Sequence, residues 1–224
     1  MIRFDILTIF PEAVEPYMNS SMLKAAQIGK RAAIFVRNLR DWGIGSHKKV
    51  DERPYGGGPG MVFRVEPIVD ALKSLKLSKG ARVVFFSPAG KTFDSKTAAA
   101  WATGSKRIVC VAGHYEGIDE RVKKIAKDMG FKVEEISVGP YVLTGGEIPA
   151  MIVVDAVLRH VPGVLGHDES LEEKRHGVGV PMYTRPEVFE MGKKKYKVPD
   201  VLKSGNHAKI DEWRRKQKMV RNKI

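Results

Sequence analysis

The sequence predicts an α/β fold built on a parallel sheet, followed by a small C-terminal helical domain. Over the first 160 residues, short apolar runs alternate with segments of helical pattern, and this alternation is typical of strand–helix–strand units. Hydrophobic residues make up 43% of the 224-residue chain, which suffices for a sizeable core. We expect an α/β domain over residues 1–160, a linker over 161–184 and a basic helical domain over 185–224.

The expected elements of the first domain follow from these runs. Apolar runs bounded by turn residues predict strands over 3–10, 32–38, 82–86, 108–112 and 131–136. Helical patterns lie between and after them, over 11–28, 66–75, 97–103, from about 121 to 129, and over 147–160. In the C-terminal region, helical spacing is clearest over 208–219.

The expected helix from Glu147 to His160 is apolar nearly all round, which predicts a place in a core or at a subunit interface. Asp155 and Arg159 share one face of it at i,i+4 spacing and can pair. A buried ion pair and a catalytic Arg159 are equally compatible with this spacing.

Three expected strands end in small or turn-forming residues, at Ser87-Pro88, at Gly113 and at Ser137. In open α/β sheets, ligands bind beyond the carboxyl ends of the strands. We therefore expect one composite pocket at these ends. The segment 137–149 would form its main wall, because its glycines allow close approach of a backbone or a flat ligand. A tight strand-to-helix connection without a ligand is the alternative.

A long glycine-rich segment precedes the third strand. Four of the five residues 56–60 are glycine, yet neither the nucleotide-triphosphate nor the dinucleotide fingerprint is present. Long loops inside a domain are usually functional or mobile. Because Arg53 and Tyr55 stand beside this bare backbone, we expect them to contact a nucleotide of a large substrate; a plain flexible loop is the alternative.

The charge of +13 is concentrated at the C-terminal end, where residues 191–224 alone carry a net +9. This distribution indicates a polyanionic partner, or else a tail that only keeps the protein soluble. Cys110 is the single cysteine and lies in an apolar run, which excludes an internal disulfide and argues against a catalytic thiol.

The sequence predicts a soluble cytoplasmic protein without a structural metal. No apolar run approaches the roughly 18 residues of a membrane span, and the N-terminus lacks the layout of a signal peptide. The spacing of His160, His167 and His176 matches no common zinc site.

Five segments together resemble one family. They are Arg-Pro-Tyr-Gly-Gly-Gly-Pro-Gly-Met at 53–61, Tyr-Glu-Gly-Ile-Asp-Glu-Arg at 115–121, Tyr-Val-Leu-Thr-Gly-Gly-Glu at 141–147, Pro-Gly-Val-Leu-Gly at 162–166 and Tyr-Thr-Arg-Pro-Glu-Val at 183–188. In this order they resemble the bacterial tRNA (guanine-N1-)-methyltransferases, a family of knotted SPOUT methyltransferases. The resemblance covers nearly the whole chain.

This resemblance implies a deep trefoil knot in the α/β domain, an exception to the rule that chains do not thread their own loops. It also implies a homodimer with active sites at the interface, S-adenosylmethionine bound in the knot, and methyl transfer to N1 of the guanine 3′-adjacent to the anticodon of tRNA. The positions that would hold the cofactor are Ser87, Pro88, Gly113, Glu116, Val138, Gly139, Pro140, Tyr141, Val142, Leu143, Gly145 and Gly146. The C-terminal domain would grip the anticodon arm, with RNA contacts at Arg185, Asn206, His207, Arg214 and Arg215 besides Arg53 and Tyr55.

The implied chemistry needs a proton acceptor, because N1 of guanine carries a proton. It also needs a cation near O6, and Arg159 matches the family's arginine. The family's linker aspartate, however, is matched here by Lys174, which cannot take a proton in its charged form. Glu173, one residue earlier, is the first candidate for the base, followed by Glu172, Glu169 and Asp168. Alternatively, all four are solvated linker carboxylates.

Other departures from the family pattern are His114 in place of arginine, Pro140 in place of aspartate, Asn206 near the C-terminus, and about five extra residues between 121 and 137. Pro140 removes one N–H donor from the cofactor loop. Two further functions stay open: a non-catalytic tRNA-binding protein that retains the cofactor pocket, and a knotted methyltransferase that acts on another RNA position.

Overall fold

The computed structural model describes residues 1–165 and 180–221, with the side chains of 218–221 excepted. The chain divides into two compact units, Met1–Leu165 and Gly166–Ile224, and each unit is described by itself. In the described residues, no helix has the length and apolarity that crossing a membrane requires.

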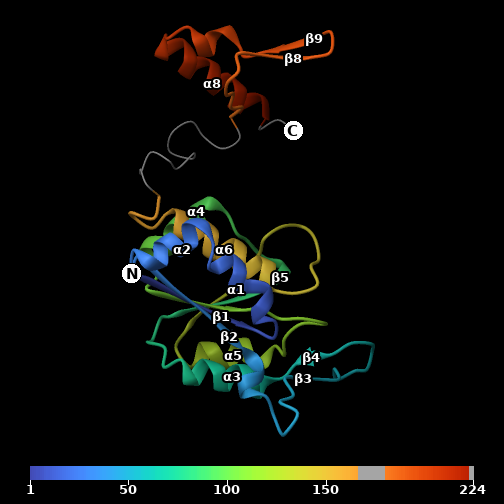
Figure 1. The fold of residues 1–224 in the computed structure, drawn as a ribbon. Helices are drawn as coiled ribbons and strands as arrows, with labels where there is room; N and C mark the ends of the chain where they lie inside the picture. Colours follow the sequence, from blue (N-terminus) through green and yellow to red (C-terminus); the bar gives the residue numbers. More distant parts are fainter. Residues whose placement is uncertain (166–179, 222–224) are drawn as a thin grey trace. The chain divides into compact units, whose positions relative to one another are not determined.

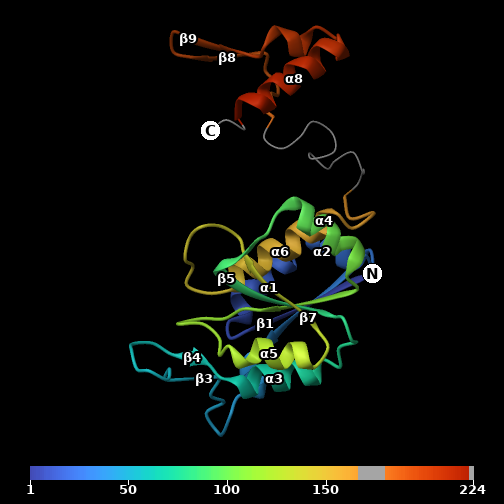
Figure 2. The same ribbon diagram turned by 180° about the vertical axis from the view of Figure 1, so that it is seen from behind.

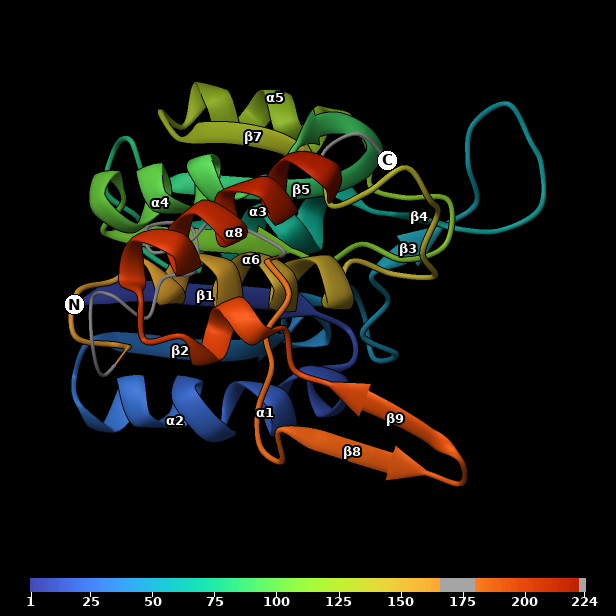
Figure 3. The same ribbon diagram turned by 90° about the horizontal axis from the view of Figure 1, so that it is seen from above.

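Five parallel strands form the centre of the first unit (Figure 1). They are β1 (Ile2–Thr8), β2 (Ala32–Asn38), β5 (Arg82–Thr92), β6 (Arg107–Val111) and β7 (Lys132–Ser137). Their order is β2-β1-β6-β5-β7, and each neighbouring pair is parallel. Figure 3 shows β2, β1, β5 and β7 side by side in this order. The predicted α/β class with a parallel sheet is confirmed.

Helices cover both faces of the sheet (Figures 1 and 2). On one face lie α1 (Pro11–Met18), α2 (Ser21–Ile28), α4 (Ser95–Gly104) and α6 (Glu147–Arg159); on the other lie α3 (Val65–Ser74) and α5 (Arg121–Asp128). Side chains alternate between the two faces along β1. Phe4 and Ile6 lie in the hydrophobic core under α1, α2, α4 and α6, and Leu7 lies in a second core under α3 and α5. Burial on both faces explains why the strands read as continuous apolar runs.

The expected single helix over 11–28 is two helices, α1 and α2. Polar side chains at the junction end the first one: Asn19 Nδ2 donates to the carbonyl of Glu15 and Ser20 Oγ to that of Tyr17. Such local bonds compete with continuation of the helix. Hydrophobic periodicity does not register this break, because both helices turn apolar residues to the same core.

Strand β5 does not end at Ser87-Pro88, as the sequence suggested, but continues to Thr92. Its register against β7 shifts between Phe86 and Lys91, both of which pair with Ile136. Residues 87–90 therefore form a bulge in the strand. Gly90 is required there, because a Cβ would lie 2.6 Å from the backbone carbon of Ile136.

The glycine-rich segment is the tip of a short hairpin. It connects β3 (Asp51–Glu52) and β4 (Val62–Phe63), which pair antiparallel, and the 3-10 helix η1 (Leu39–Trp42) lies before them. Figure 1 shows this tip extending away from the sheet. Gly56, Gly57, Gly58 and Gly60 all have positive φ, a conformation that favours glycine.

The second unit contains a hairpin that the sequence analysis did not expect. Strands β8 (Val188–Met191) and β9 (Lys194–Lys197) pair antiparallel around Gly192-Lys193, and η3 (Asp200–Lys203) and α8 (His207–Arg221) follow. Phe189 opposite Tyr196 is a typical cross-strand aromatic pair. Alternation beside a glycine turn could have revealed this hairpin; the high density of lysine concealed it.

Candidate active site

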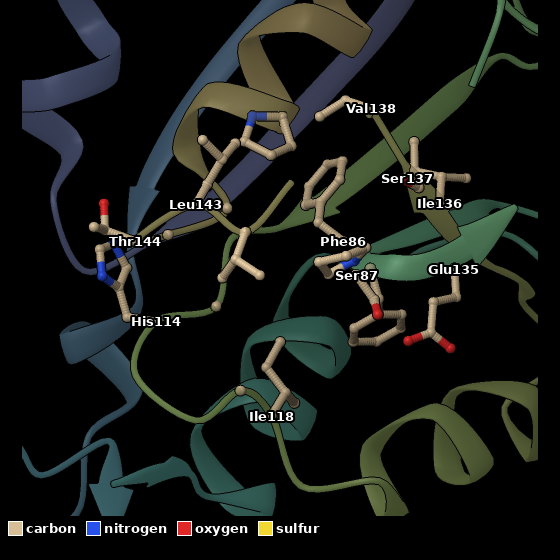
Figure 4. A pocket seen from close by; sticks show the side chains of 18 of the residues that line it. Phe86, Ser87, His114, Ile118, Glu135, Ile136, Ser137, Val138, Leu143 and Thr144 are labelled. Carbon is tan, nitrogen blue, oxygen red and sulfur yellow. The ribbon is translucent and has the colours of Figure 1, made fainter. Parts of the chain in front are cut away.

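A cavity of about 430 Å³ lies at the carboxyl ends of β5, β6 and β7, a volume typical of small-molecule sites. Three segments line it: the β5 bulge with its flanks, the segment after β6, and the loop between β7 and α6. Figure 4 shows their side chains converging on one space. The three strand ends that the sequence analysis singled out thus do meet, and β7, β5 and β6 are adjacent in the sheet.

Eleven of the twelve residues predicted to hold the cofactor line this cavity. They are Ser87, Pro88, Gly113, Glu116, Val138, Gly139, Tyr141, Val142, Leu143, Gly145 and Gly146. Pro140 is exposed and lies outside the lining residues. The structure thereby places these residues together; their role as cofactor ligands stays a prediction.

The loop between β7 and α6 packs tightly against the segment after β6. Gly146 N–H donates to the carbonyl of Gly113 at 2.8 Å, and a Cβ on Gly146 would lie 2.7 Å from Ala112 Cα. At Gly139, a Cβ would meet the ring of Tyr141, whose hydroxyl donates to the carbonyl of Val138. Gly146 is therefore needed for close approach of two backbone segments, whereas at Gly139 the exposed ring of Tyr141 could move aside.

The glycine-rich hairpin is attached to the same site at its base. Glu116 N–H donates to the carbonyl of Met61 at 3.0 Å, and Phe63 N–H donates to that of Gly117 at 2.9 Å. Arg53 is exposed, and Tyr55 is 99% exposed. Both side chains are accessible, and their predicted contact with RNA stays a prediction.

One wall of the cavity carries a line of charged side chains. Lys123 Nζ donates to Glu120 at 2.7 Å and to Glu135 at 2.8 Å, and all three residues line the cavity together with Glu116. Burial favours the neutral amine of Lys123, but the two hydrogen bonds outweigh it and raise the pKa of this side chain. These four side chains carry a net negative charge, which suits a cationic ligand.

A buried polar group that no sequence pattern indicated lies beside the cavity. Glu147, the first residue of α6, is 7% exposed; its Oε1 accepts a hydrogen bond from Thr8 Oγ1, and its Oε2 lies 2.7 Å from His114 Nε2. His114 and Thr144 line the cavity next to each other in Figure 4. His114 stood out in the sequence only as a departure from the family pattern, and Thr8 lies 139 positions from Glu147. No local signal could have joined these residues.

Arg159 does not line this cavity. It lies on a groove of about 550 Å³ formed by α1 and α6, beside Tyr17, Ile152 and Asp155. It lies twelve positions after Glu147 in α6, a distance of about 18 Å along the axis. The hydroxyl of Tyr17 donates to Asp155, and this hydrogen bond raises the pKa of Tyr17. Within one chain, the predicted catalytic arginine and the cavity are therefore apart.

The candidate bases lie outside the described residues; this holds for Glu173, its neighbours Glu172, Glu169 and Asp168, and for Lys174. His167 and His176 lie there as well. In the described part of the chain, no group of three His, Cys, Asp or Glu side chains could hold a metal ion. Burial, with the charge of Asp5 as a second cause, raises the pKa of Cys110 to about 12, so its thiol stays protonated.

The predicted RNA contacts of the second unit are exposed or half-buried. Arg185, Asn206, His207 and Arg215 are exposed, and Arg214 pairs with Asp211. Asn206 also has a structural role, since its Oδ1 accepts from Lys209 N–H and caps α8. An amide that caps a helix has fewer groups left for RNA.

A five-stranded parallel sheet with a glycine-walled cavity beyond its strand ends is the arrangement in which α/β proteins bind small ligands. The model of the tRNA (Guanine-1)-methyltransferase TrmD family matches residues 2–224. The chain belongs to this family.

Similar proteins in several bacteria carry the name tRNA (guanine-N(1)-)-methyltransferase. That of Dictyoglomus turgidum is 48% identical over 97% of this chain and 85% of the relative. That of Desulfitobacterium hafniense is 45% identical over 98% and 81%, and that of Staphylococcus carnosus is 44% identical over 98% and 87%. The likeness therefore extends over both units.

Proposed function

We propose that this protein transfers a methyl group from S-adenosylmethionine to N1 of a guanine in tRNA, the guanine 3′-adjacent to the anticodon. The observation that carries the proposal is the similarity to named tRNA (guanine-N(1)-)-methyltransferases over 97–98% of the chain. It is supported by the cavity at the strand ends, which has the volume and the mixed lining of a cofactor site.

The cavity fits this cofactor chemically. Apolar side chains such as Ile118, Val138 and Leu143 suit a flat adenine, and the neighbouring backbone N–H and C=O groups can bind its edge. The acidic groups around Lys123 suit a ligand that carries a sulfonium and an ammonium group. When bound, S-adenosylmethionine would supply an electrophilic methyl group, and the residues that line the cavity would position it for transfer.

The trefoil knot and the homodimer are part of this proposal. The groove between α1 and α6 leaves Ile148 and Ile152 exposed at 52% and 37%, and a second copy would cover them. Arg159 lies on this groove, so a dimer would let one subunit's arginine approach the other subunit's cavity. There it would stabilise the charge on guanine O6.

The second unit is proposed to grip the anticodon arm. Residues 191–224 carry a net charge of +9, and a polyanion is the partner that such a charge favours. Arg185, His207, Arg214 and Arg215, together with Arg53 and Tyr55 of the first unit, are the proposed contacts. Residues 1–160 would then serve cofactor binding and catalysis, 161–184 would connect the domains, and 185–224 would bind RNA.

The decisive experiment incubates the protein with methyl-labelled S-adenosylmethionine and unmodified tRNA, followed by digestion and mass spectrometry of the nucleosides. We expect label in 1-methylguanosine next to the anticodon. Label in another nucleoside would assign a different methyl acceptor. Binding of cofactor and tRNA without any label would favour the non-catalytic alternative, which Lys174 at the aspartate position suggests.

A further inference from the structure

His114 is held at the cavity by a carboxylate that is itself fixed. Its Nε2 lies 2.7 Å from Glu147 Oε2, while Glu147 Oε1 accepts from Thr8 Oγ1. Thr8 Oγ1 in turn accepts from the N–H of Phe10 at 2.9 Å, which directs its own hydroxyl proton to Glu147. The side chain of Glu147 is only 9% exposed, whereas that of His114 remains 16% exposed on the cavity wall.

Packing fixes the imidazole ring as well. The ring of Phe10 packs edge-on against the imidazole with 4.9 Å between the ring centres, and the ring centre of Tyr115 lies 6.0 Å from that of His114. Gly145 leaves room for the ring, because a Cβ at that position would lie 2.2 Å from Nε2. Contacts with Phe10, Tyr115 and Gly145, together with the hydrogen-bonding distance to Glu147, therefore restrict the position of the ring.

The hydrogen bond to Glu147 determines which nitrogen can accept a proton. An ionised carboxylate only accepts hydrogen bonds, so Nε2 is the donor in this pair and the neutral ring has its lone pair on Nδ1. Among the described residues, Nδ1 has no hydrogen-bond partner. A carboxylate that orients an imidazole and stabilises its charged form is the arrangement of a general base.

We propose that His114 is the proton acceptor of the methyl transfer and that Glu147 is its positioning residue. The inference rests on the proposed function. As the methyl carbon leaves the cofactor sulfur and bonds to guanine N1, the N1 proton passes to Nδ1. The sulfonium becomes a neutral thioether, and the positive charge ends on the imidazolium, beside the carboxylate of Glu147.

The groups that face the imidazole of His114 determine which ionisations can affect the pH profile of methylation. Glu147 faces it from α6 and Tyr115 from its own segment, while the end of β1 and the cavity loop contribute the uncharged Thr8, Phe10 and Gly145. Protonation of His114 removes the lone pair on Nδ1. A protonated Nδ1 cannot accept the N1 proton, so the methylation rate should fall as the pH is lowered.

The test compares full-length His114→Gln with the wild type in single-turnover methylation at saturating cofactor and tRNA. Glutamine can still donate to Glu147 but has no basic nitrogen. We expect the rate to fall about 10²- to 10⁴-fold and the acidic limb of the pH profile to disappear, with cofactor affinity near the wild-type value. His47→Gln, the same change at an exposed loop position, is the matched control and should leave rate and profile unchanged.

A second measurement does not depend on turnover. Nitrogen NMR of the histidine side chains, with the His114 signal assigned by its absence from His114→Gln, should show neutral His114 protonated on Nε2 and not on Nδ1. The opposite tautomer would overturn the proposal, whatever the activity.

The kinetic outcomes separate the inference from the proposed function. A wild type that forms no 1-methylguanosine ends both. An active wild type with an equally active His114→Gln ends only the inference, as does an equal loss of rate and cofactor affinity, which would make His114 a binding residue. An acidic limb that survives in His114→Gln and disappears in Glu173→Gln would assign the proton to Glu173 instead.

Discussion

Asp5 has a buried carboxylate whose negative charge is balanced by three arginine side chains. It is completely buried in β1, and its carboxylate accepts from Arg3, Arg37 and Arg107. Burial raises the pKa of this carboxyl, but the three hydrogen bonds outweigh that effect and hold the pKa below its usual range. The guanidinium groups of Arg3 and Arg37 also lie over the exposed ring of Phe35.

Asp5→Asn should therefore destabilise the first unit by about 3 to 5 kcal/mol, because three arginines lose their common counter-charge. Urea unfolding measures this loss. Asp70→Asn is the control, since Asp70 is exposed and pairs only with Lys73 among the described residues; it should cost less than about 1 kcal/mol. Equal losses in the two variants would contradict the assignment.

The same residue predicts a pH dependence. Because the folded-state pKa of Asp5 is lowered, its stabilising contribution is present above the unfolded-state pKa of about 3.8 and is lost as the pH falls through the lower folded-state pKa. Wild-type unfolding free energy should drop in that acidic range, and the part due to Asp5 should be missing in Asp5→Asn. Unfolding curves at a series of pH values measure both.

At the scale of elements, α6 has two apolar faces with different partners. Ala150, Val153 and Val154 are fully buried in the core that α1, α2 and α4 share. Ile148 and Ile152 remain exposed on the groove with α1. The sequence predicted that this helix, apolar nearly all round, lies in a core or at an interface. The first face confirms the core, and the second face stays a proposed interface.

Ile152→Glu should separate the proposed dimer, because a carboxylate would be placed in an apolar contact. Sedimentation equilibrium should then give the mass of one chain, with the methylation rate reduced because Arg159 no longer reaches a partner's cavity. Ile28→Glu, at a 73% exposed position on α2, is the control and should keep the wild-type mass. A wild type that is already monomeric would refute the proposed interface.

At the scale of the whole molecule, the two units divide the charge unequally. Residues 191–224 carry +9 of the total +13, while the first unit contains the cavity and both cores. A chain that ends at Thr184 should therefore bind cofactor as the full chain does but bind tRNA more weakly. Its affinity should also depend less on salt, since each lost phosphate contact lowers the slope by about 1.

Filter binding over a series of salt concentrations measures this prediction. A full-length variant with Arg214, Arg215 and Lys216 all changed to glutamine keeps the domain and removes only charge, so it should show part of the same change. An unaltered affinity in the shortened chain would mean that the basic region only keeps the protein soluble.

The sequence by itself determined the features that local pattern encodes. Alternating apolar runs predicted the parallel sheet, and the turn residues after three strands predicted the composite cavity. The family resemblance implied twelve cofactor positions, and eleven of them line that cavity. Motifs in a fixed order predicted the family, which the comparisons confirmed. These features depend on residues close together in the chain, so the amino-acid sequence alone can indicate them.

Only the tertiary structure decided which distant residues meet. It joined Thr8, His114 and Glu147 beside the cavity, gathered three arginines around Asp5, and placed Arg159 on a different surface from the cavity. The physical reason is that burial makes a polar group find partners wherever the fold supplies them. Apart from Arg3, which lies two positions from Asp5, these partners are far apart in the chain, and no periodicity records them.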